Sequence, residues 1–133
     1  MHLIFKIHQT PEMVFDYLTD MQKFVSVHPV ISKIDRLSEN NYLVHETLKF
    51  GFIPFSFTYP VTIQQDLDRK RVEMKATVMK ITKIEMTFNL RQENDFTIVE
   101  ESILFKSPLP IKFIMQNIFR KQHNKLFKNI EIK

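Results

Sequence analysis

The sequence predicts an α+β protein in which an antiparallel sheet of about seven strands packs against one long C-terminal helix. Two changes of hydrophobic period carry this prediction. Apolar side chains recur every three or four positions over residues 11–27 and 111–130, as in amphipathic helices, whereas residues 31–105 alternate with the period of two that is typical of strands. No repeat or low-complexity linker divides the chain, so we expect a single domain over residues 1–133.

The first strand and the helical region after it are predicted from their start and stop signals. Residues 2–8 alternate in part, as a strand does. Thr10 is a suitable N-cap, Pro11 suits the first helical position, and Glu12 faces the positive end of the helix. The helical region should end before His28-Pro29, because proline disfavours helical geometry in the residue before it. One or two short helices should therefore follow the first strand.

Six further strands are predicted from runs rich in Val, Ile, Thr, Phe and Tyr. The runs are residues 31–38, 42–50, 55–65, 71–79, 82–91 and 96–105. Short polar clusters separate several of them, which implies antiparallel hairpins. Because the chain has one glycine, Asn and Asp must form most of the turns. The break near residues 78–82 lacks a turn residue and is inferred mainly from strand length.

The C-terminal segment predicts a long amphipathic helix that begins after Pro110. Its apolar stripe contains one polar residue, Gln122. Lys121, Lys125 and Lys128 fall on the opposite side. This basic face is either simply solvated or a peripheral contact with an anionic membrane.

Composition removes several classes of chemistry. The chain has no Cys, so disulfides, thiolate catalysis and Cys-rich zinc sites are excluded. Its five His show no metal-ligand spacing, and one glycine is too few for a glycine-rich phosphate loop. We therefore assign no catalytic residue, expect no cofactor or metal, and expect no nucleic-acid partner, since no recognition motif accompanies the basic charge. With neither a secretion leader nor a transmembrane run, a cytoplasmic location is the expectation.

The order of elements, together with residues 10–29, resembles the START-like SRPBCC superfamily. The matching positions are Thr10-Pro11, Val14, Leu18, Asp20, Phe24 and Pro29. The resemblance implies a helix-grip fold, in which a curved antiparallel sheet wraps the C-terminal helix and encloses a cavity for an apolar ligand. Branches of the superfamily include polyketide cyclases and aromatases, coenzyme Q-binding proteins and lipid-transfer domains. His28 departs from the pattern, because many relatives carry Trp or another apolar residue there.

Residues 50–59 hold five aromatic rings. On a strand, Phe55, Phe57 and Tyr59 share one face, because successive side chains point to opposite sides. The rings either pack on the C-terminal helix or line a cavity, while the tip Phe52-Ile53 is the part best placed to be exposed. Thirteen Phe and seven Met suit either a core or an adaptable pocket.

Two polar residues stand inside apolar rows, Glu46 in a strand and Gln122 in the helix, and each needs water, a protein partner or a ligand group. Glu100 and Glu101 are adjacent and so face opposite ways, which argues against one shared acid–base pair. The predicted cavity-lining residues are Phe24, His28, Glu46, Leu48, Phe50, Phe52, Phe55, Phe57, Tyr59, Met74, Met86, Met115, Phe119 and Gln122.

The sequence therefore favours a non-catalytic protein that binds or transports a hydrophobic small molecule or lipid in a cavity between the sheet and the C-terminal helix. One alternative is an enzyme of the polyketide cyclase or dehydratase type. A second is an interaction module that uses the basic helix and the Phe52-Ile53 tip at a membrane surface or on a protein.

Overall fold

The computed structural model describes residues 1–133, apart from the side chain of Phe50. Its elements are β1 (His2–Ile7), α1 (Pro11–Thr19), α2 (Met21–Val27), β2 (Ile31–Ser38), β3 (Asn41–Phe50), β4 (Ile53–Asp66), β5 (Arg71–Val78), β6 (Thr82–Glu93), β7 (Phe96–Lys106) and α3 (Lys112–Glu131). The predicted order, with two short helices after the first strand and one long helix at the end, is confirmed.

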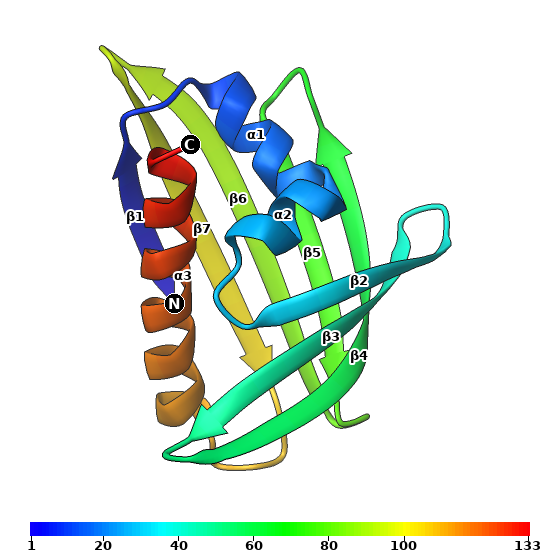
Figure 1. Ribbon diagram of the computed structural model, residues 1–133. Helices are drawn as coiled ribbons and strands as arrows, with labels where there is room; N and C mark the ends of the chain where they lie inside the picture. Colours follow the sequence, from blue (N-terminus) through cyan, green and yellow to red (C-terminus); the bar gives the residue numbers. More distant parts are fainter.

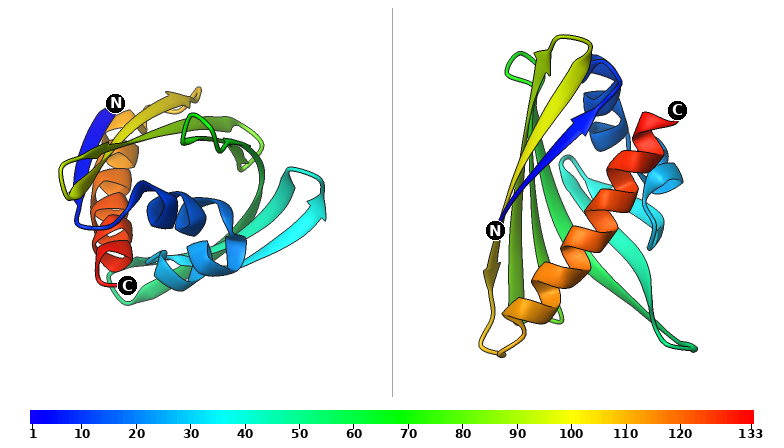
Figure 2. Two further views of the ribbon diagram at one scale, coloured as in Figure 1. Left: turned by 90° about the horizontal axis from the view of Figure 1, so that it is seen from above. Right: turned by 90° about the vertical axis from the view of Figure 1, so that its left-hand side faces the viewer.

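The strands form one antiparallel sheet in the order β1-β7-β6-β5-β4-β3-β2. The sheet curves around α3, which crosses its concave side, while α1 and α2 cover one end (Figure 1). Seen from above, the strands curl around the three helices (Figure 2). This is the helix-grip arrangement that the sequence predicts.

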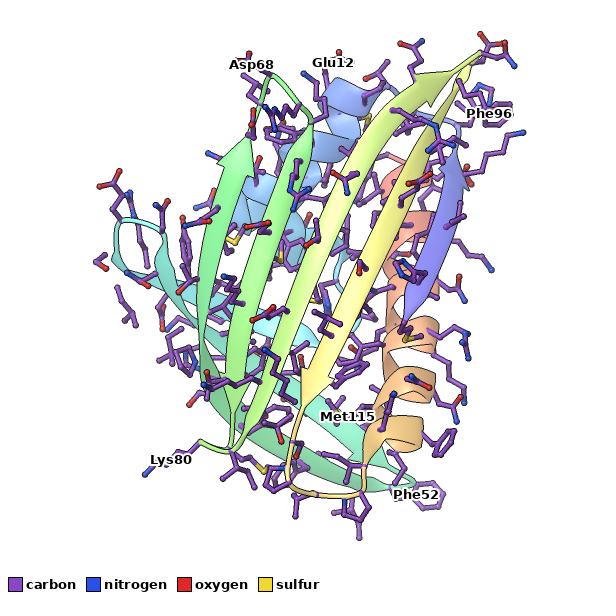
Figure 3. The ribbon with its side chains drawn as sticks, turned by 180° about the vertical axis from the view of Figure 1, so that it is seen from behind. Glu12, Phe52, Asp68, Lys80, Phe96 and Met115 are labelled. Atoms are coloured by element: carbon purple, nitrogen blue, oxygen red, sulfur yellow. The ribbon has the colours of Figure 1, made fainter. Side chains whose placement is uncertain are left out.

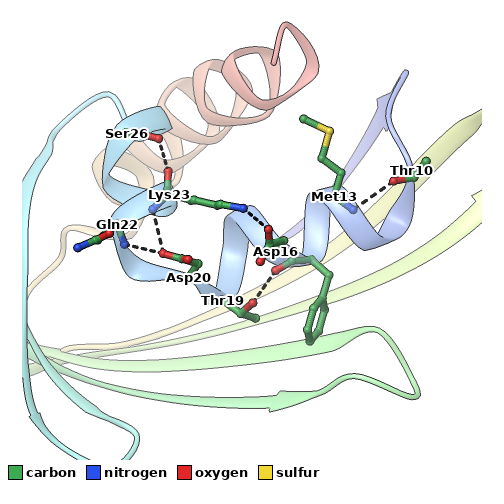
Figure 4. A network of polar contacts seen from close by, with 9 residues as sticks. Thr10, Met13, Asp16, Thr19, Asp20, Gln22, Lys23 and Ser26 are labelled. Atoms are coloured by element: carbon green, nitrogen blue, oxygen red, sulfur yellow. Dashed lines mark hydrogen bonds and ion pairs between the residues drawn. The ribbon is translucent and has the colours of Figure 1, made fainter.

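Two capping residues divide the first helical region into α1 and α2 (Figure 4). The Thr10 hydroxyl accepts a hydrogen bond from the backbone N–H of Met13 at 3.2 Å, which starts α1. Asp20 ends α1 in an extended conformation, and its carboxylate accepts from the N–H groups of Gln22 and Lys23 at 3.0 and 3.2 Å. One side chain therefore satisfies two free donors of α2, as N-caps do.

The hairpin between β5 and β6 turns without glycine or asparagine. Met79 and Lys80 both take left-handed φ angles, 53° and 65°. The break that strand length predicted near residues 78–82 is thus present, between Val78 and Thr82. Gly51 makes the corresponding turn between β3 and β4, at a φ of 65°.

The apolar core fills the end of the molecule that α1 and α2 cover. Phe127 of α3 is buried there, with its ring centroid 4.5 Å from that of Phe5 and 6.1 Å from that of Phe88. The first turn of α3 is different, since Phe113 and Ile114 are exposed. The second half of α3 is therefore packed into the core, whereas its first half covers a less filled part of the sheet. No helix in the described part of the chain is long and apolar enough to cross a membrane.

Candidate functional site

A cavity of about 360 Å³ lies between the concave face of the sheet and α3. This volume falls within the range of small-molecule sites, roughly 300–1,000 Å³. Its walls come from β2 to β6, from α2 and from the first half of α3, and most of the lining side chains are apolar. The gap exists because the large core residues gather at the other end of α3.

Twelve of the fourteen side chains predicted to line a cavity do line it. They are Phe24, His28, Glu46, Leu48, Phe55, Phe57, Tyr59, Met74, Met86, Met115, Phe119 and Gln122. The side chain of Phe50 lies outside the described part of the structure. That these residues contact a ligand stays a prediction.

Phe52 does not line the cavity. Its side chain is completely exposed, beyond the Gly51 turn at the tip of the β3–β4 hairpin. Phe52 precedes the first residue of β4, Ile53, so the alternation that turns later β4 side chains inward does not include it.

The aromatic face of β4 forms one wall of the cavity. The ring centroids of Phe55 and Phe57 are 5.5 Å apart, and those of Phe57 and Tyr59 are 5.8 Å apart. All three rings line the cavity, so the inward face that strand alternation predicts borders open space.

Glu46 and Tyr59 form a polar pair on this wall. The Tyr59 hydroxyl donates a hydrogen bond to Oε1 of Glu46 at 2.9 Å, across the β3–β4 pair. Burial raises the pKa of Glu46 above its ordinary value, although the bond from Tyr59 and the nearby His123 act in the opposite direction. Burial, with Glu46 as a second cause, raises the pKa of Tyr59 well above 10.0. Tyr59 is thus a permanent donor, and Glu46 holds its proton to a higher pH than an exposed glutamate.

His28 forms a second polar group, where α2 meets β2. Its Nδ1 accepts hydrogen bonds from the backbone N–H groups of Val30 and Ile31, both at 3.2 Å. Burial lowers its pKa from 6.5 to about 3, and the charge of His123 adds to this effect. The ring is therefore neutral near pH 7, and its proton is assigned to Nε2 because Nδ1 accepts. No described residue pairs with that Nε2–H, and the ring lines the cavity.

We expect His28 to make the fold sensitive to mild acid. A folded-state pKa of about 3 against 6.5 unfolded means that its stabilising contribution is complete above pH 6.5 and is lost as the pH falls toward 3. Each pH unit in this window removes at most about 1.4 kcal/mol. His28→Asn keeps a side-chain acceptor for the backbone but does not titrate, so urea unfolding should show a smaller loss between about pH 7 and pH 5. His2→Asn, at an exposed position of β1, is the matched control, and equal pH dependence in all three proteins would contradict this role.

The sequence interpretation missed a buried carboxyl–imidazole pair, Glu101 with His123. The two residues are 1% and 3% exposed. Nδ1 of His123 lies 2.7 Å from Oε1 of Glu101, to which it is hydrogen-bonded, and 2.6 Å from Oε2, which it approaches outside bonding geometry. Oε2 has no hydrogen-bond partner among the described residues. Because a carboxylate only accepts, Nδ1 is the donor, which leaves Nε2 as the nitrogen of His123 that is free to meet a guest in the cavity it lines.

The position of this pair explains why it was missed. Glu101 shares the inward face of β7 with Val99 and Ile103, so alternation does mark it as a buried carboxylate. Its partner comes from α3, 22 residues later, and lies beside the Phe88 and Phe119 rings at centroid distances of 6.1 and 5.3 Å. The prediction that Glu100 and Glu101 face opposite ways is correct, but only Glu101 turns inward.

The cavity thus combines apolar walls with four polar groups of known hydrogen-bonding role: Glu46, Tyr59, His28 and His123. Gln122 adds an amide that no described side chain pairs with. Across the described residues, no cluster of three His, Asp or Glu side chains is arranged to hold a metal ion.

Comparison with known proteins assigns the family. The model of the family of CoxG, a subunit of carbon monoxide dehydrogenase, matches residues 4–102. No curated protein matches the chain.

Solved structures share the fold at low identity. Ara h 8.0201 superposes with a TM-score of 0.78 at 17% identity, covering 98% of this chain and 93% of that one. A START superfamily protein from Mycobacterium smegmatis gives a TM-score of 0.76 at 13% identity, with 98% and 93% covered. The di-domain aromatase/cyclase (ARO/CYC) StfQ from the steffimycin biosynthetic pathway gives 0.80 at 10% identity, and here 98% of this chain corresponds to 45% of StfQ. The chain therefore has the START-like helix-grip fold and belongs to the CoxG family.

Proposed function

We propose that this protein binds a hydrophobic small molecule or lipid in the cavity between the sheet and α3. The observation that carries the proposal is a cavity of about 360 Å³ whose walls are mostly apolar and which the core side chains do not fill. Removing apolar ligand surface from water supplies roughly 25 cal/mol per Å² before the costs of association. The similarity to START-like structures supports the same interpretation.

The polar groups specify one end of the ligand. The Tyr59 hydroxyl already donates its hydrogen bond to Glu46. The Nε2–H of His28 and the Gln122 amide have no protein partner among the described residues. Glu101 Oε2 is the one fully buried polar side-chain atom without a partner among the described residues, so these two donors reach the cavity surface, where a hydrogen bond to a ligand oxygen contributes about 0.5–1.5 kcal/mol. We therefore propose an elongated or ring-shaped apolar ligand with a carbonyl or hydroxyl oxygen at the end that meets these groups.

The test places a large side chain in the cavity by a single substitution on β6. Met86 faces the cavity and Thr87, next to it on β6, faces away. The apolar fluorophore N-phenyl-1-naphthylamine should bind the natural protein, and native mass spectrometry should detect a co-purifying apolar molecule. Met86→Trp should weaken fluorophore binding by about tenfold or more, which corresponds to about 1.4 kcal/mol.

Thr87→Trp adds the same ring on the other side of the sheet and should bind like the natural protein. Equal binding by both variants would place the fluorophore elsewhere. Absence of binding and of any co-purified molecule, across lipid and quinone extracts, would contradict the proposal.

A second candidate is acid–base catalysis of the cyclase or dehydratase type, which the convergence of Glu46–Tyr59 and Glu101–His123 on one cavity favours. A glutamate that keeps its proton to a higher pH than usual, near an imidazole, suits proton transfer to and from a folded ketone chain. A linear poly-β-ketone analogue should then cyclise in the presence of the protein by intramolecular aldol addition, in which an enol carbon adds to a ketone carbonyl to form a C–C bond and a hydroxyl. That hydroxyl should then leave with a proton from the neighbouring carbon as water. Glu46→Gln should abolish that reaction and leave binding of the analogue intact. Unchanged analogue after prolonged incubation would leave binding alone as the function.

A further inference from the structure

Three segments meet at the end of the molecule opposite α1. They are the β3–β4 turn, the β5–β6 turn, and the β7–α3 connection with the first turn of α3 (Figure 1). Figure 3 shows Phe52, Lys80 and Met115 at this end, while Glu12, Asp68 and Phe96 lie at the other. We call the exposed side chains of the three segments the mouth rim.

The mouth rim is apolar to an unusual degree. Its large exposed hydrophobic side chains are Phe52, Ile53, Met79, Ile81, Leu109, Phe113 and Ile114. Phe52 is fully exposed and Phe113 is 82% exposed. Seven large apolar side chains exposed at one end of a molecule are a feature of interaction sites.

The mouth rim also borders the cavity. Met79, Ile81, Leu109 and Ile114 line the cavity and are at the same time exposed to solvent. The cavity therefore opens at this end, between the turns and the start of α3. Whatever covers the mouth rim also covers the opening.

The charge of this end has one sign. The segments 47–57, 77–84 and 102–119 contain Lys49, Lys80, Lys83, Lys106 and Lys112 and neither Asp nor Glu. All five lysines are exposed, and none forms an ion pair with a described residue. The turns at the opposite end, residues 66–71 and 91–95, carry four acidic and four basic residues, and Arg69 and Arg91 pair with Asp66 and Glu93. The charge is therefore balanced in those turns, whereas the mouth end carries positive charge without acids.

We propose that the mouth rim docks on an anionic lipid bilayer, with the exposed rings inserted among the headgroups and the cavity opening against the membrane. Exposed aromatic and aliphatic side chains surrounded by lysines are the combination that binds at such an interface. The exposed apolar side chains project from three separate segments around an opening, with rings on two of them, and this shape suits a deformable surface better than a rigid protein face. This inference goes beyond the ligand-binding function and does not depend on it.

The surface differs from the one that the sequence suggested. Lys121, Lys125 and Lys128 are exposed on the outer side of α3, but no large exposed hydrophobic side chain accompanies them between residues 115 and 131. A surface with charge alone binds an anionic membrane weakly, and salt screens that binding. The apolar contribution is at the mouth rim.

Sedimentation with phosphatidylcholine vesicles, with and without phosphatidylglycerol, tests the proposal. The natural protein should bind only the anionic vesicles, and salt should weaken the binding. The double variant Lys80→Gln/Lys112→Gln should lower partitioning by about fivefold for each lysine removed. Phe52→Ser/Phe113→Ser should abolish detectable binding at the same lipid concentration.

Two matched controls locate the surface. Lys121→Gln/Lys125→Gln removes the same charge from the outer side of α3, and Leu37→Ser removes an exposed apolar side chain on β2, far from the cavity lining. Both should bind vesicles like the natural protein. Loss of binding in Lys121→Gln/Lys125→Gln but not in the mouth-rim variants would overturn the proposal, as would absence of binding to any vesicle.

The outcome is separable from that of the ligand experiment. Neither Phe52 nor Phe113 lines the cavity, so Phe52→Ser/Phe113→Ser should bind N-phenyl-1-naphthylamine normally in the absence of vesicles. Size-exclusion chromatography tests the competing explanation, that the mouth rim binds a second copy of the chain. If the natural protein forms dimers that are lost in Phe52→Ser/Phe113→Ser, and if it binds no vesicles, docking on lipid is overturned.

Discussion

Replacing His123 by Leu is expected to lower the free energy of unfolding by about 3–5 kcal/mol, because it leaves the Glu101 carboxyl group buried without the imidazole that hydrogen-bonds to it. Both side chains are within a few per cent of complete burial. The Phe88 and Phe119 rings surround the imidazole, so water does not readily replace it. Urea unfolding near neutral pH, followed by circular dichroism, measures the loss.

Two further variants separate the polar pairing from the packing. The double variant Glu101→Leu/His123→Leu removes both polar groups and should recover much of the stability lost in His123→Leu, since an apolar pair of similar volume often replaces such a buried pair at little cost. Glu100→Leu is the matched control: Glu100 is exposed and pairs with Arg91 on the surface, where an ion pair contributes about 0–1 kcal/mol. Additive losses in the double variant would contradict a coupled buried pair.

The second large effect concerns the attachment of α3. Phe127→Ala should lower the free energy of unfolding by about 3–5 kcal/mol, because the ring packs against Phe5 and Phe88 and truncation leaves a cavity in the core. Phe113→Ala removes the same atoms from the first turn of the same helix. Because Phe113 is exposed, its stability should change by no more than about 0.5 kcal/mol.

The comparison of these two variants tests how α3 is held. Thermal or urea unfolding of both proteins should show the asymmetry directly. Similar losses in both variants would mean that the first half of α3 is packed as tightly as the second, which would conflict with the open cavity beneath it. The ligand site depends on this asymmetry, since a helix docked along its full length would fill the space.

Much of this architecture is readable from sequence because local rules decide it. Strand alternation places Phe55, Phe57 and Tyr59 on one face whatever they meet, and turn residues or strand length fix the hairpins. The paired carboxylate and imidazole were not readable, because Glu101 and His123 meet only through the way α3 crosses β7. Strand alternation alone does mark Glu101 as an inward carboxylate that needs a partner. The sequence therefore predicts that a partner exists but not which residue it is.

The sequence does not predict whether the space between the sheet and α3 is filled either. Apolar side chains on a sheet face and on a helix stripe have the same pattern whether they touch or leave a gap. The outcome depends on the angle at which α3 lies across the sheet and on the large residues of its second half, which set that angle. Phe52 shows a related limit: an aromatic residue close to an aromatic strand face suggests a cavity contact, but Phe52 lies in the turn before β4 and its side chain is fully exposed.

The way α3 begins has a consequence for dynamics. Ile111 at the N-cap gives no side-chain hydrogen bond to the first turn, no acidic residue lies there, and Lys112 places a positive charge at the positive end of the helix. These features lower the local free energy of unwinding, so the amide hydrogens of residues 113–116 should exchange with solvent far faster than those near Leu126. Fraying of a single turn, without any hinge or moving domain, would then widen the opening of the cavity.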